Sequence, residues 1–194
     1  MDTLASVPNS QSSFACLDFI NSRWRDHRDG IGVYDRLPNP QWQNWFLERW
    51  RLRPEPGTGP LPLHDLVGAR SALRALLESW ASGQQPPAGE VAALDRILAR
   101  SHVQRRLEAS AGHLNLRDEP ARRDWTWVLG ELVASAAALA GAGPSARLKV
   151  CGNDLCSWLF WDESHNLSRR WCDAATCGNL VKVRNHRQRR RAQA

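Results

Sequence analysis

The sequence lacks the patterns that define several common protein classes. Its most apolar stretch, 128–142, is too short to cross a bilayer and contains Glu131. Residues 1–13 are polar and show no secretory signal, so we expect a cytoplasmic protein without a membrane partner. The motifs H-E-x-x-H and G-x-S-x-G and a glycine-rich phosphate loop are all missing, and the histidines are scattered. An enzyme is therefore the least favoured class.

Tyrosine and methionine are nearly absent, with one residue each, whereas tryptophan occurs ten times. Indole rings are large and mostly apolar, so we expect most of them in the core, with their N–H groups bonded to acceptors. The chain has 194 residues, of which 42% are hydrophobic, which suffices for one medium domain and one small domain.

Residues 1–143 have the pattern of a helix-rich α+β domain with a few short strands. Helical spacing of apolar residues, or alanine richness, predicts helices over 41–50, 63–80, 90–107 and 127–140. We expect strands at 14–21, which is apolar and β-leaning, and at 113–117, where apolar and polar residues alternate. Within the first of these, Asp18 and Asn21 should bond to neighbouring backbone.

The balance of charge changes at 141–145, a segment of small and helix-breaking residues. Before Arg147, sixteen basic and sixteen acidic residues cancel, whereas from Arg147 onward there are ten basic and four acidic residues. The whole net charge of +6 therefore lies in the last part of the chain. We place a domain boundary here, with domains at 1–143 and 147–194, and expect the basic second domain to seek a polyanion.

Four of the five cysteines lie in the second domain with the spacing C-x4-C-x15-C-x4-C, at Cys151, Cys156, Cys172 and Cys177. Two short loops can direct four thiolates at one point, which predicts a structural Zn²⁺ site with no open position for substrate. Two disulfides are a less favoured alternative, because cytoplasmic thiols stay reduced. Gly152 and Asn153 suit the tight first loop because both tolerate positive φ, and Gly178 gives the same freedom after the last cysteine. The fifth cysteine, Cys16, should be a buried apolar residue.

The segment between the two cysteine pairs has apolar ends and a polar middle. This pattern predicts a β-hairpin formed by 158–161 and 167–171, with Asp162, Glu163 and His165 solvated at its turn.

A helix rich in arginine should follow Cys177. Leu180 and Val181 would face the zinc core, and the second half, which has nothing to bury, would project from the module. Phosphates would relieve the repulsion among its arginines. The nucleic-acid contacts that we expect come from Arg169, Arg170, Lys182, Arg184, His186, Arg187, Arg189, Arg190 and Arg191.

Several motifs resemble a known family. The cysteine pair Cys151…Cys156, the run Ser168-Arg-Arg-Trp-Cys172 and Cys177-Gly-Asn179 with its basic helix are similar to the CGNR zinc-finger family of bacterial transcription regulators. The run Leu17-Asp-Phe-Ile-Asn-Ser22 resembles the accompanying ABATE domain, which is described as stress-related. The resemblance implies a treble-clef-like module that binds zinc through its four cysteines and binds DNA. The fourth motif residue, an arginine in the family, is Leu180 here, so any contact made by that arginine is missing.

The leading hypothesis is therefore a DNA-binding transcription regulator whose basic helix enters the major groove and mostly contacts phosphates. One small module gives limited specificity, so we expect a homodimer or a second contact. Two alternatives stay open. The second domain could be an RNA-binding module, or it could be a protein-interaction adaptor in which zinc only stabilises the small domain and the basic C-terminal segment binds an acidic protein. A small-molecule ligand in the tryptophan-rich interior of the first domain is a further hypothesis.

Overall fold

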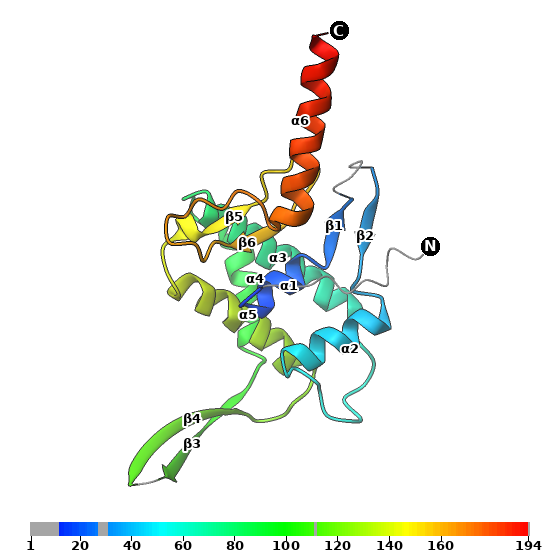
Figure 1. The fold of residues 1–194 in the computed structure, drawn as a ribbon. Coiled ribbons are helices and arrows are strands. Elements are labelled where there is room, and N and C mark those ends of the chain that lie inside the picture. Colours follow the sequence, from blue (N-terminus) through cyan, green and yellow to red (C-terminus); the bar gives the residue numbers. More distant parts are fainter. Residues whose placement is uncertain (1–11, 27–30, 111, 194) are drawn as a thin grey trace.

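The computed structural model describes residues 12–26, 31–110 and 112–193 (Figure 1). In chain order, the helices and strands are α1 (Ala15–Ile20), β1 (Arg23–Arg25), β2 (Val33–Asp35), α2 (Pro40–Arg49), α3 (Leu63–Ala81), α4 (Ala88–Leu98), β3 (Val103–Ser110), β4 (His113–Pro120), α5 (Trp125–Gly141), η1 (Ser145–Arg147), β5 (Leu148–Val150), β6 (Leu159–Trp161), η2 (Ala174–Gly178) and α6 (Asn179–Ala192). The strands form three antiparallel pairs, β1–β2, β3–β4 and β5–β6. This mixture of helices and short strands is the α+β class that the sequence predicts.

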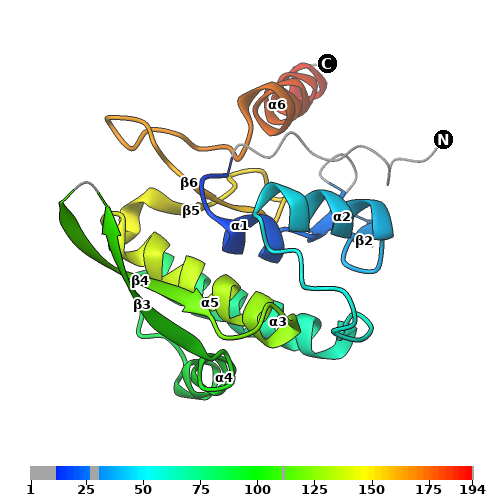
Figure 2. The ribbon, with the colours of Figure 1, turned by 90° about the horizontal axis from the view of Figure 1, so that it is seen from below.

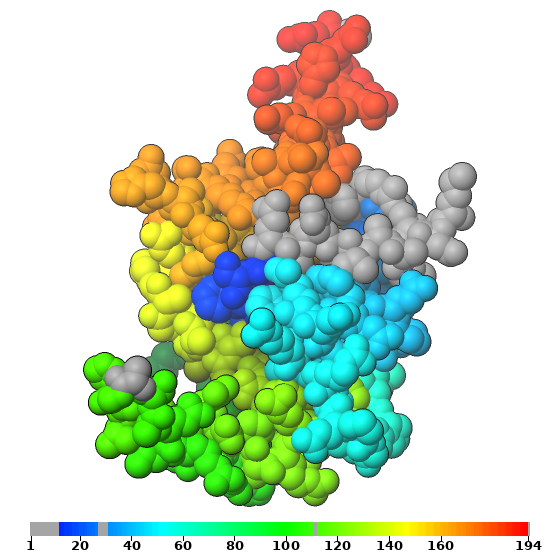
Figure 3. Space-filling model, turned by 60° about the horizontal axis from the view of Figure 1, so that its bottom comes forward, coloured from blue at the N-terminus to red at the C-terminus, as the bar shows by residue number. Residues whose placement is uncertain are grey.

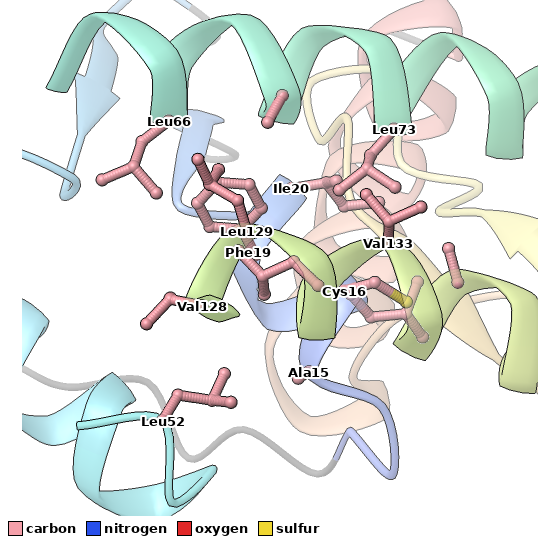
Figure 4. Packing of buried hydrophobic residues seen from close by; sticks show 14 of the residues in the cluster. Ala15, Cys16, Phe19, Ile20, Leu52, Leu66, Leu73, Val128, Leu129 and Val133 are labelled. Carbon is pink, nitrogen blue, oxygen red and sulfur yellow. The ribbon is translucent and has the colours of Figure 1, made fainter. Parts of the chain in front are cut away.

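The short helix α1 occupies the centre of the core (Figure 4). Five of its six residues are buried, and it packs against both α3 and α5. The prediction of a strand at 14–21 is therefore wrong. A run this short and this apolar has no polar face, so its periodicity cannot distinguish a buried helix from a buried strand.

The longer helices agree with the sequence. The helix α2 begins at Pro40, where Asn39 Oδ1 accepts hydrogen bonds from the N–H groups of Gln41 (2.8 Å) and Trp42 (3.4 Å). The helix α3 matches the prediction to within one residue. The helix α5 begins two residues earlier than expected, because Asp124 caps its first turn.

The predicted helix at 90–107 is only half correct. The helix α4 ends at Leu98, and the chain then enters β3, which pairs along its whole length with β4. Val103 and Leu107 are four residues apart, a spacing that fits both a helix and one face of a strand. The strand predicted at 113–117 is confirmed and extends to Pro120.

The hairpin β5–β6 packs onto the helical body. Leu148 and Leu159 belong to the same core cluster as α1, α3 and α5. The side chain of Asn21 donates to the Leu159 carbonyl (2.8 Å) and accepts from the Leu159 N–H (3.1 Å), so it bonds the backbone of a distant strand rather than neighbouring backbone as predicted. The carboxylate of Asp18 likewise bonds a side chain, the indole N–H of Trp50 (3.0 Å). The ring of Trp161 stacks on that of Trp80 in α3, with 6.5 Å between the ring centroids. The cysteine-bearing segment is thus built directly onto the first 143 residues.

Most of the tryptophans line this core, as predicted, whereas Trp158 and Trp171 pack against the cysteine cluster. Three of the ten are buried and the other seven are half-buried. Among their N–H groups, that of Trp50 donates to Asp18 Oδ2 (3.0 Å) and that of Trp127 donates to Glu131 Oε1 (3.1 Å). A cavity between Trp42 and Trp125 measures about 20 Å³, and a second hollow beside Trp24 measures about 190 Å³.

Two elements project from opposite ends of the molecule (Figures 1 and 3). The helix α6 leaves one end, and the hairpin β3–β4 leaves the other. Seen from below, the body lies in layers, with α6 on one side, α1, β5 and β6 next, then α3 and α5, and α4 farthest away (Figure 2). Within the described part of the chain, no helix combines the length and the apolarity that a bilayer span requires.

Candidate metal centre and basic helix

The fold brings the four predicted ligands to one point. The Sγ atoms of Cys151, Cys156, Cys172 and Cys177 all lie within 4.8 Å of one another. The distance from Cys172 Sγ is 3.8 Å to Cys156 Sγ and 3.6 Å to Cys177 Sγ. Four sulfurs at about 2.3 Å from a tetrahedral Zn²⁺ ion would be about 3.8 Å apart. The geometry therefore fits a structural zinc ion held by four thiolates.

The two cysteine pairs come from different kinds of local structure. The first pair lies on the loop that joins β5 to β6, where the N–H of Cys151 donates to the carbonyl of Trp158 (2.9 Å). Cys177 lies in the helical turn η2, which Asp173 caps by accepting from the Thr176 N–H (2.6 Å). A loop on a hairpin and the start of a helix are the two halves of a treble-clef-like module, and a bound zinc ion would join them.

Asn153 supports the metal centre from a fully buried position. Its side-chain amide donates to Cys177 Sγ (3.6 Å), and its Oδ1 atom accepts from the N–H of Leu155 (3.3 Å) and from Arg184 on α6 (3.2 Å). A hydrogen bond to a ligating sulfur orients the ligand and stabilises its negative charge. Asn153 thus connects the first cysteine loop, the last ligand and the basic helix.

The glycines beside the ligands have a different role from the predicted one. Among the described residues, Gly152, Asn153 and Gly178 are not in the positive-φ region, so the loops do not use the conformational freedom that these residues offer. Instead, both glycines make room for the indole of Trp171. A Cβ atom at Gly152 or at Gly178 would lie 3.1 Å from the Trp171 ring. Trp171 therefore covers both loops, and this is why a side chain is missing at both positions.

The thiols perturb one another because they are so close. The pKa of Cys151 is lowered, chiefly by a hydrogen bond from Cys156, whereas the pKa values of Cys156 and Cys172 are raised, chiefly by their interaction with Cys151. Four adjacent thiolates require a cation, which is what Zn²⁺ supplies when it is bound. Cys16 is different: burial raises its pKa to about 12, which agrees with a structural thiol.

The connection between the cysteine pairs differs from the prediction. The strand β6 pairs with β5, rather than with 167–171. Asp162 is fully buried rather than solvated, and its Oδ2 atom lies 2.7 Å from Lys149 Nζ. Burial alone would raise the pKa of Asp162, but Lys149, Ser164 and the N–H of Arg169 lower it well below its usual value. Glu163 and His165 are not buried, as expected.

The same lysine anchors the far end of the connection. Its ammonium group also donates to the carbonyl groups of Leu167 (2.5 Å) and Arg169 (3.1 Å). The pair Lys149–Asp162 therefore holds the chain between the second and third ligands, and sequence reasoning missed it. The available signal was a lysine inside an apolar strand-like run together with an aspartate directly after another such run.

The arginine-rich helix forms as predicted. The helix α6 carries six Lys or Arg residues and no acidic residue. Val181 is buried and Leu180 is half-buried, so both lie on the side that the sequence assigns to the zinc core. From Asn185 to Gln193 every residue is exposed, and the helix projects away from the body (Figure 1).

The expected nucleic-acid contacts fall into two groups. Arg169 and Arg184 turn inward: Arg169 donates to the carbonyl groups of Trp171 (2.9 Å) and Cys172, and Arg184 donates to Asn153. The others are exposed, and these are Arg170, Lys182, His186, Arg187, Arg189, Arg190 and Arg191. A groove of about 480 Å³ lies between Trp171 and α6, and Arg170, Lys182 and Arg184 help to line it.

The fold and the site define a helical α+β body that carries a small zinc module with a basic helix. Residues 147–190 match the sequence model of the CGNR zinc finger, and residues 14–143 match that of ABATE, described as "Putative stress-induced transcription regulator". The chain therefore belongs to the ABATE family and ends in a CGNR zinc finger, which confirms the resemblance. Comparison with curated proteins finds no match.

Proposed function

We propose that this protein is a DNA-binding transcription regulator of the cytoplasm, in which the zinc module presents α6 to the major groove. Membership of a family of transcription regulators supports a role in gene regulation. The observation that carries DNA binding is the helix itself. It is basic, free of acidic residues, and exposed over its whole second half.

The size of α6 suits this role. Its 14 residues correspond to a rod about 21 Å long, and the major groove of B-DNA is about 12 Å wide, which admits an α-helix. The body does not cover the projecting half, so DNA can approach it (Figure 1). Anchoring at the zinc site orients the rod before DNA binds, which lowers the entropy lost on binding.

The basic residues differ in role according to where they point. Lys182, His186, Arg189 and Arg190 face away from the zinc core, and Arg187 and Arg191 flank them. We assign these side chains mainly to phosphate contacts, with Arg170 at the base of the groove as an additional contact. Arg169 and Arg184 hold the module together, and their effect on DNA binding is through the position of α6.

The first test is the salt dependence of binding to duplex DNA. If four phosphates are neutralised, the association constant should fall roughly 100-fold between 50 and 200 mM salt. Fluorescence anisotropy with labelled DNA measures this dependence. A flat response would overturn the proposal. Structured RNA added as a competitor addresses the alternative, because RNA that displaces the duplex at equal concentration would favour an RNA-binding module.

The second test asks whether α6 itself, rather than the net charge of the protein, is responsible for DNA binding. Replacing Arg187 and Arg190 with Gln should weaken DNA binding at least tenfold, because the variant neutralises fewer phosphates and releases fewer counterions. The matched control replaces Arg96 and Arg100, which are exposed at the remote helix α4 and its C-terminal end, and should have little effect. Equal effects of both pairs would mean that overall charge, rather than α6, drives binding. No effect of the α6 pair would favour a protein-binding adaptor.

A further inference from the structure

The hairpin β3–β4 is the least covered part of the described chain. All eight residues of β3 and the first six of β4 are exposed. It leaves the body at the end opposite α6 (Figure 1). An isolated two-stranded hairpin is marginally stable in water. Its length and regular pairing therefore need a reason beyond the fold of the body.

One face of this hairpin is apolar. Directly paired residues of antiparallel strands point to the same side, so the register divides the side chains into two sets. The apolar side is built from four rows: Val103 with Pro120, Arg105 with Asp118, Leu107 with Leu116, and Ala109 with Leu114. The exposed fraction is 68% for Leu107, 71% for Leu114 and 64% for Leu116.

The other face is entirely polar. It consists of Gln104, Arg106, Glu108, Ser110, His113, Asn115, Arg117 and Glu119. Two ion pairs cross this face, Arg106 with Glu119 at 3.8 Å and Arg117 with Glu108 at 3.4 Å. A hairpin that merely extended into solvent would have no reason to segregate leucines on one side. The alternation is typical of a sheet whose apolar face is covered.

We propose that a second copy of this chain covers the apolar face, through a two-fold axis that runs parallel to the hairpin between two facing hairpins. This symmetry places each row opposite the same row of the partner with the strands exchanged. Leu107 then meets Leu116 of the other chain, and Leu114 meets Ala109. The row of Arg105 and Asp118, which lie 3.6 Å apart in one chain, favours this arrangement. Across the axis, Arg105 of each chain faces Asp118 of the other, so opposite charges meet twice.

The area of the hairpin sets the strength of this dimer. Two eight-residue strands present a face roughly 26 Å long and 10 Å wide, or about 260 Å² on each chain. Stable interfaces bury about 800 Å² on each partner, so the hairpins alone give a weak dimer that dissociates in the micromolar range or above. This inference is independent of DNA binding, and its test contains no DNA.

Sedimentation velocity of the zinc-loaded full chain, from about 1 µM to about 1 mM, tests the proposal. We expect a concentration-dependent shift from monomer to dimer. Leu107→Asp should raise the dissociation constant at least tenfold, as for a central interface residue. Ser110→Asp adds the same charge to the polar face and should leave the constant unchanged. Circular dichroism and zinc content confirm that each variant is folded.

Two charge variants test the symmetry itself. Arg105→Asp and Asp118→Arg should each be monomeric alone, because like charges then face each other across the axis. An equimolar mixture of the two should dimerise again, since each chain supplies the charge that the other needs. A mixture that stays monomeric, or a Leu107→Asp variant that dimerises like the wild type, would overturn the proposal. A wild-type protein that is monomeric at every concentration would also overturn it and leave another protein as the partner.

Discussion

The substitution Asp162→Asn should destabilise the protein measurably, although it changes little more than one atom outside the metal ligands. Asp162 Oδ2 accepts from Lys149 Nζ (2.7 Å) and from the N–H of Arg169 (3.0 Å), and its Oδ1 accepts from the N–H (2.9 Å) and hydroxyl (2.6 Å) of Ser164. An asparagine has the same shape. It can keep one oxygen for Ser164, but its NH₂ group would then face two donors.

The expected cost follows from burial. Removing one partner of a buried ion pair costs about 3–5 kcal/mol. The side chain of Lys149 is 25% exposed and keeps its bonds to two carbonyl groups, so we expect the lower end, about 3 kcal/mol. For a chain of this size, that corresponds to a fall of about 6–12 °C in the melting temperature.

Urea unfolding of the zinc-saturated protein measures this change, with Glu163→Gln as the control. Glu163 is the adjacent carboxylate, but it is exposed, so its replacement should change the free energy of unfolding by no more than about 0.5 kcal/mol. If Asp162→Asn costs no more than Glu163→Gln, the buried pair does not stabilise the module and our account of the connection fails.

The pH dependence of the same difference has a definite sign. The pKa of Asp162 is lower in the folded protein than in the unfolded chain, where it is about 3.9. Its contribution to stability is therefore complete above about pH 4 and is lost as the pH falls through the folded pKa. The difference in the free energy of unfolding between the wild type and Asp162→Asn should be constant at neutral pH and should decrease progressively in acid. A difference that increases in acid would contradict the assigned charge state.

Three further changes probe the body and the metal. Gly130→Ala should cost about 1–3 kcal/mol in urea unfolding, because the new Cβ would collide with the side chain of Ser101, whereas Gly68→Ala, with open space around it, should be neutral or slightly stabilising. Asn21→Ala should cost about 2–4 kcal/mol, because it leaves the buried N–H and C=O of Leu159 without their partner; a smaller loss than about 1 kcal/mol would show that the link is weak. Removing zinc with a chelator should lower the melting temperature, and Zn²⁺ but not Mg²⁺ should restore it.

The sequence predicted those features that depend on local repetition. The helices at 41–50 and 63–80 extend over enough turns for their apolar spacing to be unambiguous, and the two equal cysteine spacings point to one metal site. The basic helix followed from composition alone. These signals are local, and tertiary contacts did not override them.

The failures have a common cause, which is that the deciding partner lies far away in the sequence. The run at 14–21 became a helix because the body surrounds it on all sides. The strand β6 pairs with β5 rather than with 167–171, and both candidates are short runs that mix apolar and basic residues. Gly152 and Gly178 were needed for the indole of Trp171, which no local pattern reveals. Without knowledge of these distant neighbours, local patterns offer no means of choosing.

The shared core at Leu148 and Leu159 has a consequence for how independently the zinc module can change. A chain cut after Gly143 would expose a cavity where these two leucines belong, and the severed finger would carry them into water. The zinc module therefore cannot be removed or replaced as a self-contained unit without repacking this core. The outer turns of α6 are not under this constraint, because their side chains are exposed and can change without disturbing the core.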